Sequence, residues 1–387
     1  MKTDILVSGG GIAGLTAAAA FGSAGYDVIC VDPVTDPPED LRSTAFLQPA
    51  IPVLEAAGLW DVLSPEAAPL QVMRIVDAGG VLPEPRVVTE FNAAEISDAP
   101  FGWNLPNTLL RRVMTERLAA LPNVRHLRGA AAQRLATREA EARVTLSDGG
   151  SVQARLVIAA DGRDSAMRRA AGIEARVTRY GQKALAFRVG HRVPHENVST
   201  EVHRSGGPFT LVPLPDRDGQ HQSAVVWMEA GPEAERLRAL PPEDLSRAAT
   251  ERSAGVLGEL TLASGVGIFP IIAQIATRMA GERLALMAEA AHVMPPIGAQ
   301  GLNTSLADLA ALLDLARPET LGSAAMLEAY HRRRHGTVRL RAAGIGALNR
   351  ASMLAPPMMR DLRAALLGGL HAARPLRRAL MRAGMGR

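Results

Sequence analysis

The chain lacks several residue types that common functional sites require. Its 387 residues include one cysteine, Cys30, which excludes an internal disulfide and any multi-cysteine zinc or iron–sulfur centre within one chain. Aromatic residues make up only 3% of the sequence, so a base-stacking surface for nucleic acid is not expected. The remaining composition, 47% hydrophobic and 21% charged, is that of a globular protein with enough apolar residues for a core. We predict that Cys30 packs in that core.

Patterns typical of metal sites are also missing from the sequence. It contains no H-E-x-x-H motif. His191, His195 and His203 fall in one expected strand–turn segment, where no cysteine or aspartate accompanies them. We therefore predict no metal site.

One uncharged run, residues 5–26, is long enough to cross a bilayer. It contains six glycines, and Asp4 precedes it where a signal peptide carries positive charge. We predict neither a membrane span nor a signal peptide, because a nucleotide-binding motif accounts for these features.

Charge is unevenly distributed along the chain. The whole protein has a net charge of +4, whereas residues 331–387 hold thirteen arginines, no lysine and one acid, Asp361. Two helices are expected there, over residues 327–348 and 359–381, separated by two prolines. Basic amphipathic helices of this kind either lie on anionic lipid or pack on the rest of the protein with arginine facing solvent. The sequence leaves both alternatives open.

The first motif is a complete strand–turn–helix–strand unit. An apolar strand over residues 4–8 precedes G-G-G-I-A-G at residues 9–14, an alanine-rich helix follows, and a second strand over 28–31 ends in Asp32. In such a unit the first glycine permits a tight turn, the second lets the backbone approach a pyrophosphate, and the third lets the helix pack against the strand. Asp32 is placed to accept hydrogen bonds from ribose hydroxyls. The unit predicts dinucleotide binding, without separating FAD from NAD.

Two further apolar strands run directly into polar or glycine-rich turns. Residues 156–160 lead into D-G-R-D-S, and residues 284–287 lead into A-E-A-A-H and then P-P-I-G-A-Q-G-L-N, which ends at Asn303. A helix is expected over residues 303–313. Ligand loops of parallel sheets usually lie at such strand ends, so both turns are candidates for cofactor contact.

These three motifs, in this order, resemble the FAD-dependent aromatic hydroxylases of the p-hydroxybenzoate hydroxylase fold. Within that fold the chain is most similar to the ubiquinone-biosynthesis hydroxylases. The similarity rests on R-S-T-A at residues 42–45, L-E-A-A-G-L-W at 54–60, residues 290–303, and the pair Tyr330 and Arg334. It covers nearly the whole chain.

The resemblance implies an α/β fold. A Rossmann-like FAD-binding domain would comprise residues 1–72, 98–178 and 266–320, with an inserted α+β substrate domain at 73–97 and 179–265. Strands expected over 184–189, 209–213 and 223–228 would give that insert a mostly antiparallel sheet covering the flavin. A basic helical region would follow at 321–387.

The resemblance also implies the cofactor site. Gly9, Gly11, Gly14 and Asp32 would hold the ADP half of FAD, and Arg42, at the start of a helix, and Arg111 would contact the cofactor. Asp161 and Gly162 would serve both FAD and NAD(P)H, and Glu289 would meet ribityl or ribose hydroxyls. Gly301, Leu302 and Asn303 would present backbone groups to the flavin ring, beside a loop lined by His292, Pro295 and Pro296.

One departure concerns the turn before A-A-H. The family usually has Gly-Asp there, whereas this chain has Ala288-Glu289. The glutamate keeps a carboxylate on a longer stem, and Ala288 adds a Cβ where the backbone must approach closely. We expect FAD to bind, with lower affinity.

The expected activity is that of an FAD-dependent monooxygenase, which uses NAD(P)H and O2 to hydroxylate an aromatic ring. The ring would belong to a lipophilic, polyprenylated phenol of ubiquinone biosynthesis. Because the flavin supplies the chemistry, no catalytic side chain is expected. We expect a cytoplasmic protein that contacts the inner face of the cytoplasmic membrane peripherally.

Three alternatives stand beside that activity. One is hydroxylation of a small soluble phenol. Another is a non-catalytic flavoprotein subunit of a biosynthetic complex, which Ala288-Glu289 would favour. A flavin halogenase of the same fold needs a catalytic lysine and W-x-W-x-I-P; neither Lys2 nor Lys183 is suitably placed, and residues 103–106 do not match.

Overall fold

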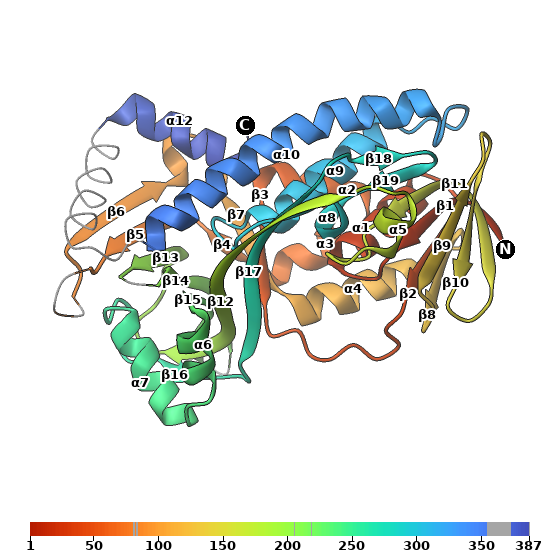
Figure 1. Cartoon of the computed structure of the whole chain (residues 1–387). Coiled ribbons are helices and arrows are strands. Elements are labelled where there is room, and N and C mark those ends of the chain that lie inside the picture. Colours follow the sequence, from red (N-terminus) through yellow and green to blue (C-terminus); the bar gives the residue numbers. More distant parts are fainter. Residues whose placement is uncertain (80–81, 83, 205, 218, 354–372, 387) are drawn as a thin grey trace.

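The computed structural model describes the whole chain except residues 80–81, 83, 205, 218, 354–372 and 387. An eight-stranded and a nine-stranded sheet lie at opposite ends of the molecule, with a three-stranded sheet between them (Figure 1). The smallest sheet contains β3 (Ser43–Leu47), β7 (Gly102–Pro106) and β4 (Ala68–Leu70).

Five parallel strands form the centre of the eight-stranded sheet. Their order is β19 (Leu284–Leu286), β11 (Ser151–Ala159), β1 (Lys2–Ser8), β2 (Val28–Asp32) and β8 (Val124–Arg128). Antiparallel neighbours β18 (Ala280–Gly281), β10 (Ala142–Leu146) and β9 (Ala132–Thr137) complete it. Parallel strands are usually covered on both faces, which explains their continuous apolar runs.

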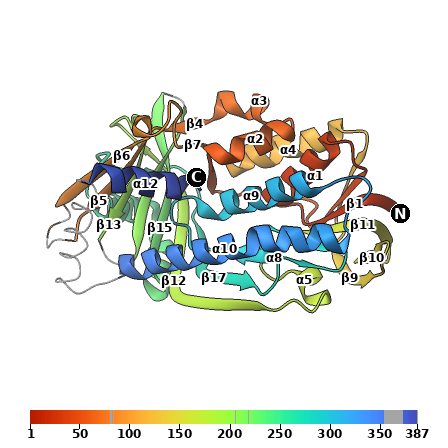
Figure 2. The same cartoon turned by 90° about the horizontal axis from the view of Figure 1, so that it is seen from above.

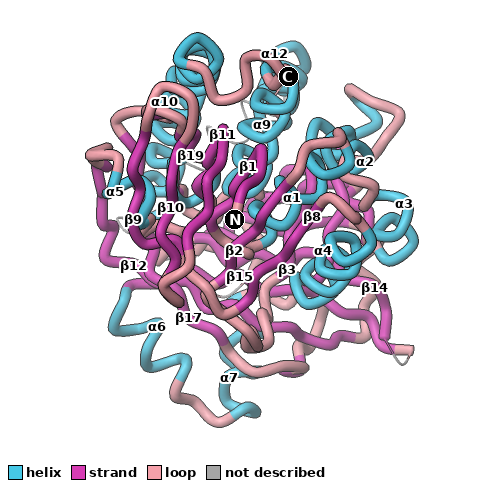
Figure 3. The backbone as a smooth tube through the Cα atoms, turned by 90° about the vertical axis from the view of Figure 1, so that its right-hand side faces the viewer, coloured by secondary structure: helices cyan, strands magenta, loops and turns pink. Residues whose placement is uncertain are grey.

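One helix packs closely on this sheet because its side chains are small. α1 (Ile12–Ser23) is rich in alanine and glycine and is buried over most of its length. It packs against α4 (Asn107–Ala120) and α9 (Gln300–Leu315), and the three helices group together beside the parallel strands (Figure 3). Cys30 is fully buried in β2, where desolvation raises the pKa of its thiol to about 12.

The nine-stranded sheet is mostly antiparallel, as the sequence predicts. Its order is β20 (His292–Val293), β17 (Gly267–Ala276), β12 (Ala175–His191), β15 (Gln220–Ala230), β14 (Pro208–Arg217), β13 (Val198–His203), β5 (Val72–Asp77) and β6 (Val87–Asn92), with β16 (Thr261–Leu262) beside β12. Only the β13–β5 pair is parallel. The strands expected over 184–189, 209–213 and 223–228 lie within β12, β14 and β15, which confirms those three predictions.

Two long strands connect the two large sheets. β12 and β17 pair from Ala175 with Ala276 to Ala186 with Gly267, and they run from one part of the molecule to the other (Figure 1). The expected domain boundary at residue 178 falls inside β12. The β12–β17 pairing therefore crosses that boundary, with a shift of register between Arg179 and Lys183.

The remaining elements are connections and covering helices. Near the three-stranded sheet are η1 (Gln48–Ala50), α2 (Ile51–Ala56), α3 (Trp60–Leu63), η2 (Ser64–Glu66) and η3 (Ala93–Glu95). α5 (Ala166–Ala170) and α8 (Ala288–Ala291) follow β11 and β19, and α6 (Gly231–Arg238) and α7 (Pro242–Arg252) cover the nine-stranded sheet. α10 (Ala324–Met353) and α12 (Arg374–Met385) both lie on the face seen in Figure 2.

Some helices predicted from the sequence have different bounds in the structure. The helix expected over 303–313 begins earlier, at Gln300, and that expected over 327–348 extends over Ala324–Met353. Of the helix expected over 359–381, residues 359–372 lie outside the described residues, and the last helix occupies Arg374–Met385. Arg42 does not start a helix: it precedes strand β3, whose Ser43 pairs with Pro106 of β7. None of the described helices is both long and apolar enough to cross a bilayer.

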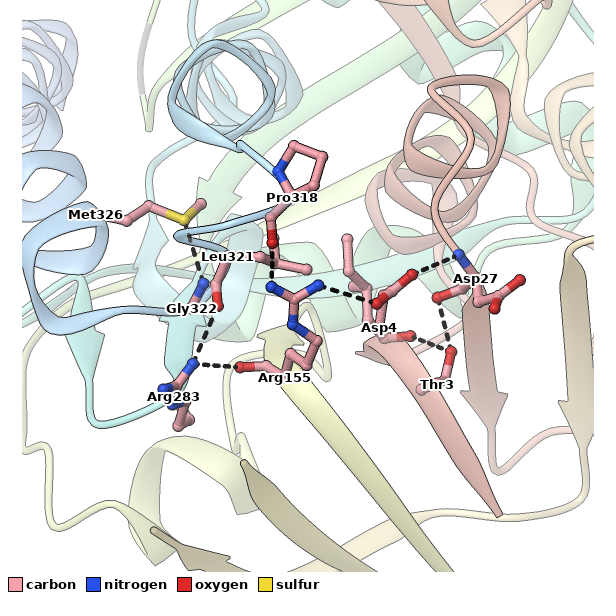
Figure 4. Close-up of polar contacts among 10 residues, drawn as sticks. Thr3, Asp4, Asp27, Arg155, Arg283, Pro318, Leu321, Gly322 and Met326 are labelled. Carbon is pink, nitrogen blue, oxygen red and sulfur yellow. Dashed lines mark hydrogen bonds and ion pairs between the residues drawn. The ribbon is translucent and has the colours of Figure 1, made fainter. Parts of the chain in front are cut away.

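Two arginines connect β1, β11 and the segment before α10 (Figure 4). Arg155 of β11 forms an ion pair with Asp4 of β1 at 3.3 Å and donates to the carbonyl of Pro318. Arg283 donates to the carbonyls of Arg155 at 3.3 Å and Leu321 at 3.0 Å. These contacts fix the segment that leads into α10.

Candidate cofactor and substrate site

The candidate cofactor residues converge at one edge of the eight-stranded sheet. β1, β2, β11 and β19 are parallel, so their carboxyl ends share an edge. The glycine loop, Asp32, Asp161 and Glu289 follow these four strands in turn. The structure thus brings together the three motifs that the sequence placed far apart.

The glycine loop leaves no space for side chains except where a ligand would approach. Gly9 has φ +112°, and a Cβ on Gly14 would lie 1.9 Å from the carbonyl oxygen of Gly9. Gly10, which the motif alone did not single out, has no room either, because its Cβ would overlap the carboxylate of Asp32. Around Gly11 no atom lies within 4 Å of the equivalent position. The open space lies at the N-terminus of α1, where unpaired N–H groups favour a phosphate.

Asp32 and Arg111 lie beside this loop. Asp32 is 5% exposed and accepts the backbone N–H of Val34 at 3.0 Å. The guanidinium of Arg111 lies 3.7 Å from the other Asp32 oxygen and donates to the carbonyl of Gly10 at 3.1 Å. Arg111 therefore places a cation next to the expected position of a diphosphate.

The turn after β11 contains a carboxylate oxygen with no partner. Asp161 Oδ2 accepts the N–H of Met167 at 3.2 Å, whereas the buried Oδ1 has no hydrogen-bond partner among the described residues. Gly162, at φ +82°, has open space around it. A buried acceptor is normally satisfied, so Oδ1 requires a donor such as a hydroxyl of a bound ligand. This oxygen, with the open backbone at Gly11, fits FAD.

Arg42 is held at the entrance to the site. Its Nε and Nη2 donate to Asp40 at 2.8 and 2.7 Å, and its guanidinium lies 4.9 Å from the ring centroid of Phe269. The hydrogen bond to Asp40 is the main cause of the raised pKa of Arg42, to which the carboxylate of Glu289 contributes. Glu289 is exposed after β19, within electrostatic reach of Arg42.

A narrow cleft lies between this part of the chain and the nine-stranded sheet. Residues 39–43, Pro106 and Thr108 line one side, and Arg188, Leu214 and Ala224 of the nine-stranded sheet line the other. The cleft places Arg42 opposite the sheet that was predicted to cover the flavin.

Buried polar contacts fix the loop between β19 and α9. His292 is fully enclosed, with its Nε2 2.5 Å from Oδ2 of Asp308, whose Oδ1 accepts from Arg334 Nε at 2.7 Å. Tyr330 donates from its hydroxyl to the carbonyl of Leu286 at 2.7 Å, which ties α10 to β19. His292 thus binds to a helix beneath the loop. Asp308 was not identified from the sequence.

The end of the loop forms the first turn of α9. The side chain of Asn303 accepts from the N–H of Leu47 and donates to the carbonyls of Ala45 and Ala299, so it is fully used by β3 and its own loop. Gly301 is exposed, with no atom within 4 Å of the position that a Cβ would occupy, and Leu302 is half-buried. Backbone N–H groups of a first helical turn have no partner within the helix, so they are available to a ligand.

The prolines of this loop differ in exposure. Pro295 is buried, whereas Pro296 is exposed. Only Pro296 therefore presents its ring to the surface of the site.

The histidines at the turn after β12 are committed to structural contacts. His191 bonds to Val193 and Ser223, and His195 bonds to Leu214 and Asn197. Within the described residues, no group of three histidine, cysteine, aspartate or glutamate side chains is arranged to hold a metal ion.

Comparisons with known proteins agree with this geometry. The family described as FAD binding domain matches residues 2–342. The ubiquinone hydroxylase UbiL of Rhodospirillum rubrum is 33% identical and covers 99% of this chain and 89% of its own length. The 3-demethoxyubiquinol 3-hydroxylase of Escherichia coli is 27% identical over 86% of this chain and 85% of its own.

A solved structure of similar fold is p-nitrophenol 4-monooxygenase PnpA from Pseudomonas putida. It matches with a TM-score of 0.81 at 19% identity, over 99% of this chain and 98% of that one. At this identity the likeness concerns the fold alone.

The geometry at Asp161 generates a first prediction. Asp161→Asn keeps an acceptor for Met167 but removes the charge, so FAD affinity should fall about 10- to 100-fold, as for loss of a charged hydrogen bond. Asp164→Asn is the matched control, because the Asp164 side chain is 86% exposed. Titration of apoprotein with FAD, followed by quenching of flavin fluorescence, measures both. Equal affinity in the two variants would show that Asp161 makes no cofactor contact.

The backbone conformation of Ala288 leads to a second prediction. Ala288 is buried with φ +54°, a conformation that costs a residue with a Cβ about 1 kcal/mol. Ala288→Gly should therefore raise the unfolding free energy by about 0.5–1 kcal/mol, measured by urea denaturation. Ala290→Gly, in the short helix that follows, should lower it. A destabilised Ala288→Gly protein would contradict the strain argument.

Proposed function

The chain belongs to the FAD binding domain family, and from this premise we propose that it is an FAD-dependent monooxygenase that hydroxylates the ring of a polyprenylated phenol in ubiquinone biosynthesis. The observation that carries the proposal is the shared edge of β1, β2, β11 and β19, where the glycine loop, Asp32, Asp161 and Glu289 meet. When bound, FAD supplies reduction by NAD(P)H and activation of O2.

The residues of this chain bind and orient the cofactor. We assign Gly9, Gly11, Gly14, Asp32 and Arg111 to its ADP half, on the contacts among the glycine loop, Asp32 and Arg111. Asp161, Gly162 and Glu289 would meet its hydroxyls. Backbone groups of Gly301, Leu302 and Asn303 would contact the flavin ring. Arg42 would lie at the cleft. Residues 1–72, 98–178 and 266–320 would form the cofactor part, and 73–97 with 179–265 the substrate part.

Turnover by the purified protein tests the proposal. We expect a bound flavin spectrum and NAD(P)H oxidation that a 2-prenylphenol stimulates, with a product that mass spectrometry shows to contain one additional oxygen atom. Stimulation by small phenols alone would favour a soluble substrate. Bound flavin without any phenol-dependent oxidation would favour a non-catalytic subunit and would contradict the proposal.

We further propose that α12 contacts an anionic membrane surface. Its inner side carries Met381 and Met385, which pack with Ala93 and Phe101, and Arg377 pairs with Glu95 at 2.5 Å. Its outer side exposes Leu376 (46%) and Leu380 (44%), beside three exposed arginines, Arg374, Arg378 and Arg382. Residues 374–387 contain no acid. Exposed leucines flanked by arginine match the chemistry of an anionic bilayer interface, where a lipophilic substrate would reside.

Vesicle flotation tests this contact. Arg378→Gln combined with Arg382→Gln should lower partitioning onto phosphatidylglycerol vesicles about thirtyfold, because each arginine near such a surface contributes about 1 kcal/mol. Arg247→Gln on α7, where the side chain is 81% exposed, is the control. Binding that is unchanged by the double substitution would refute the membrane role of α12.

A further inference from the structure

The nine-stranded sheet has two distinct faces. Val202, Phe209 and Trp227 point to the face that packs with α6 and α7. Ala184 and Met228 point the other way, into the core shared with the cofactor-binding layer. We call this second side the inner face. Figure 1 shows α6 and α7 on the side of the sheet away from α10.

Alternation and register place Glu201 and His203 on the inner face. They flank Val202 in β13, so they point opposite to it. Glu201 lies opposite Thr210, which lies opposite Val226 of β15, and Val226 packs against the main core. Ala224, which lies two residues from Val226 on β15 and two strands away from β13, lines the cleft described above.

Glu201 and His203 form a nearly buried pair. His203 Nε2 lies 2.6 Å from Glu201 Oε1, and the two side chains are 12% and 13% exposed. A carboxylate only accepts hydrogen bonds, so Nε2 carries a proton, and in the neutral imidazole Nδ1 is then an acceptor. This Nδ1 is buried and has no partner among the described residues. On the neighbouring strand, the facing charged group is Asp77, which is paired with Arg86 at 3.3 Å.

We propose that His203 Nδ1 accepts a hydrogen bond from the phenolic hydroxyl of the substrate, with Glu201 as the positioning residue that fixes its tautomer. The assignment rests on the proposed function, because it presumes a phenol on the inner face. A buried acceptor without a partner is normally satisfied by a ligand or water. A site built to bind a hydroxyl discriminates against the same molecule without it, because the site's polar atom is then left unpaired. His203 therefore selects rings that carry a free hydroxyl.

Ligand selectivity of the FAD-loaded protein tests this role. Dissociation constants are measured from the flavin spectrum for a 2-prenylphenol and for the same prenylbenzene without the hydroxyl. The wild type should bind the phenol at least tenfold more tightly, and His203→Phe should reduce that ratio to about one. Glu201→Gln, which frees the tautomer, should reduce it partly and serves if His203→Phe fails to fold. His221→Phe, on the exposed end of β15, should leave the ratio unchanged.

The outcomes separate the two proposals. A wild-type protein that oxidises NAD(P)H in response to the phenol, but whose His203→Phe and Glu201→Gln variants keep the full selectivity, overturns the assignment and leaves the proposed function standing. Absence of phenol-dependent oxidation in the wild type overturns the proposed function and the assignment with it. Loss of selectivity in both variants, with melting temperatures near that of wild type, supports the assignment, because a merely structural pair would weaken both ligands equally.

Discussion

Four parallel strands end at one edge of the eight-stranded sheet, and the loops of the candidate cofactor site leave from that edge. Their alignment depends on close packing of α1, whose alanines and glycines let the helix approach the strands. The same closeness leaves no room at Gly10 or Gly14 for a Cβ. The close packing of α1 and the shape of the glycine loop therefore depend on each other, so that a larger side chain in either one would disturb both.

The loop between β19 and α9 is held from several directions. His292 bonds to Asp308, which in turn accepts a hydrogen bond from Arg334, and the side chain of Asn303 bonds to β3. Arg168 of α5 donates to the carbonyl of Ala290 at 2.8 Å. The side chain of Asn303 is used in these contacts, whereas the buried Nδ1 of His292 has no hydrogen-bond partner among the described residues. The backbone N–H groups at the start of α9 remain available to a ligand. A rigid loop that offers backbone donors suits a flat, planar ligand.

The nine-stranded sheet contributes a surface rather than a pocket of its own. Its outer face is closed by α6 and α7, whereas its inner face meets the cofactor layer along the cleft at Arg42 and Arg188. The β12–β17 ladder fixes this geometry, because it extends from one layer to the other, with one shift of register between Arg179 and Lys183. The inner face also carries polar groups, such as the His203–Glu201 pair, whose side chains are nearly buried.

Features that depend on residues close together in the chain could be predicted from the sequence. The strand, glycine loop, helix and acid of residues 4–32 interact locally, and apolar runs marked the strands of both large sheets. Tertiary structure alone decided the contacts between distant segments: Arg111 reaches Gly10 across 101 residues, and Arg334 reaches Asp308 across 26. It also placed Arg42 before a strand, where pairing with β7 overrode the expected helix. Glu201 and His203 are two residues apart, yet their burial follows from how the whole sheet faces its neighbour. Local patterns fix what each segment can form, whereas burial and pairing arise only when the layers pack.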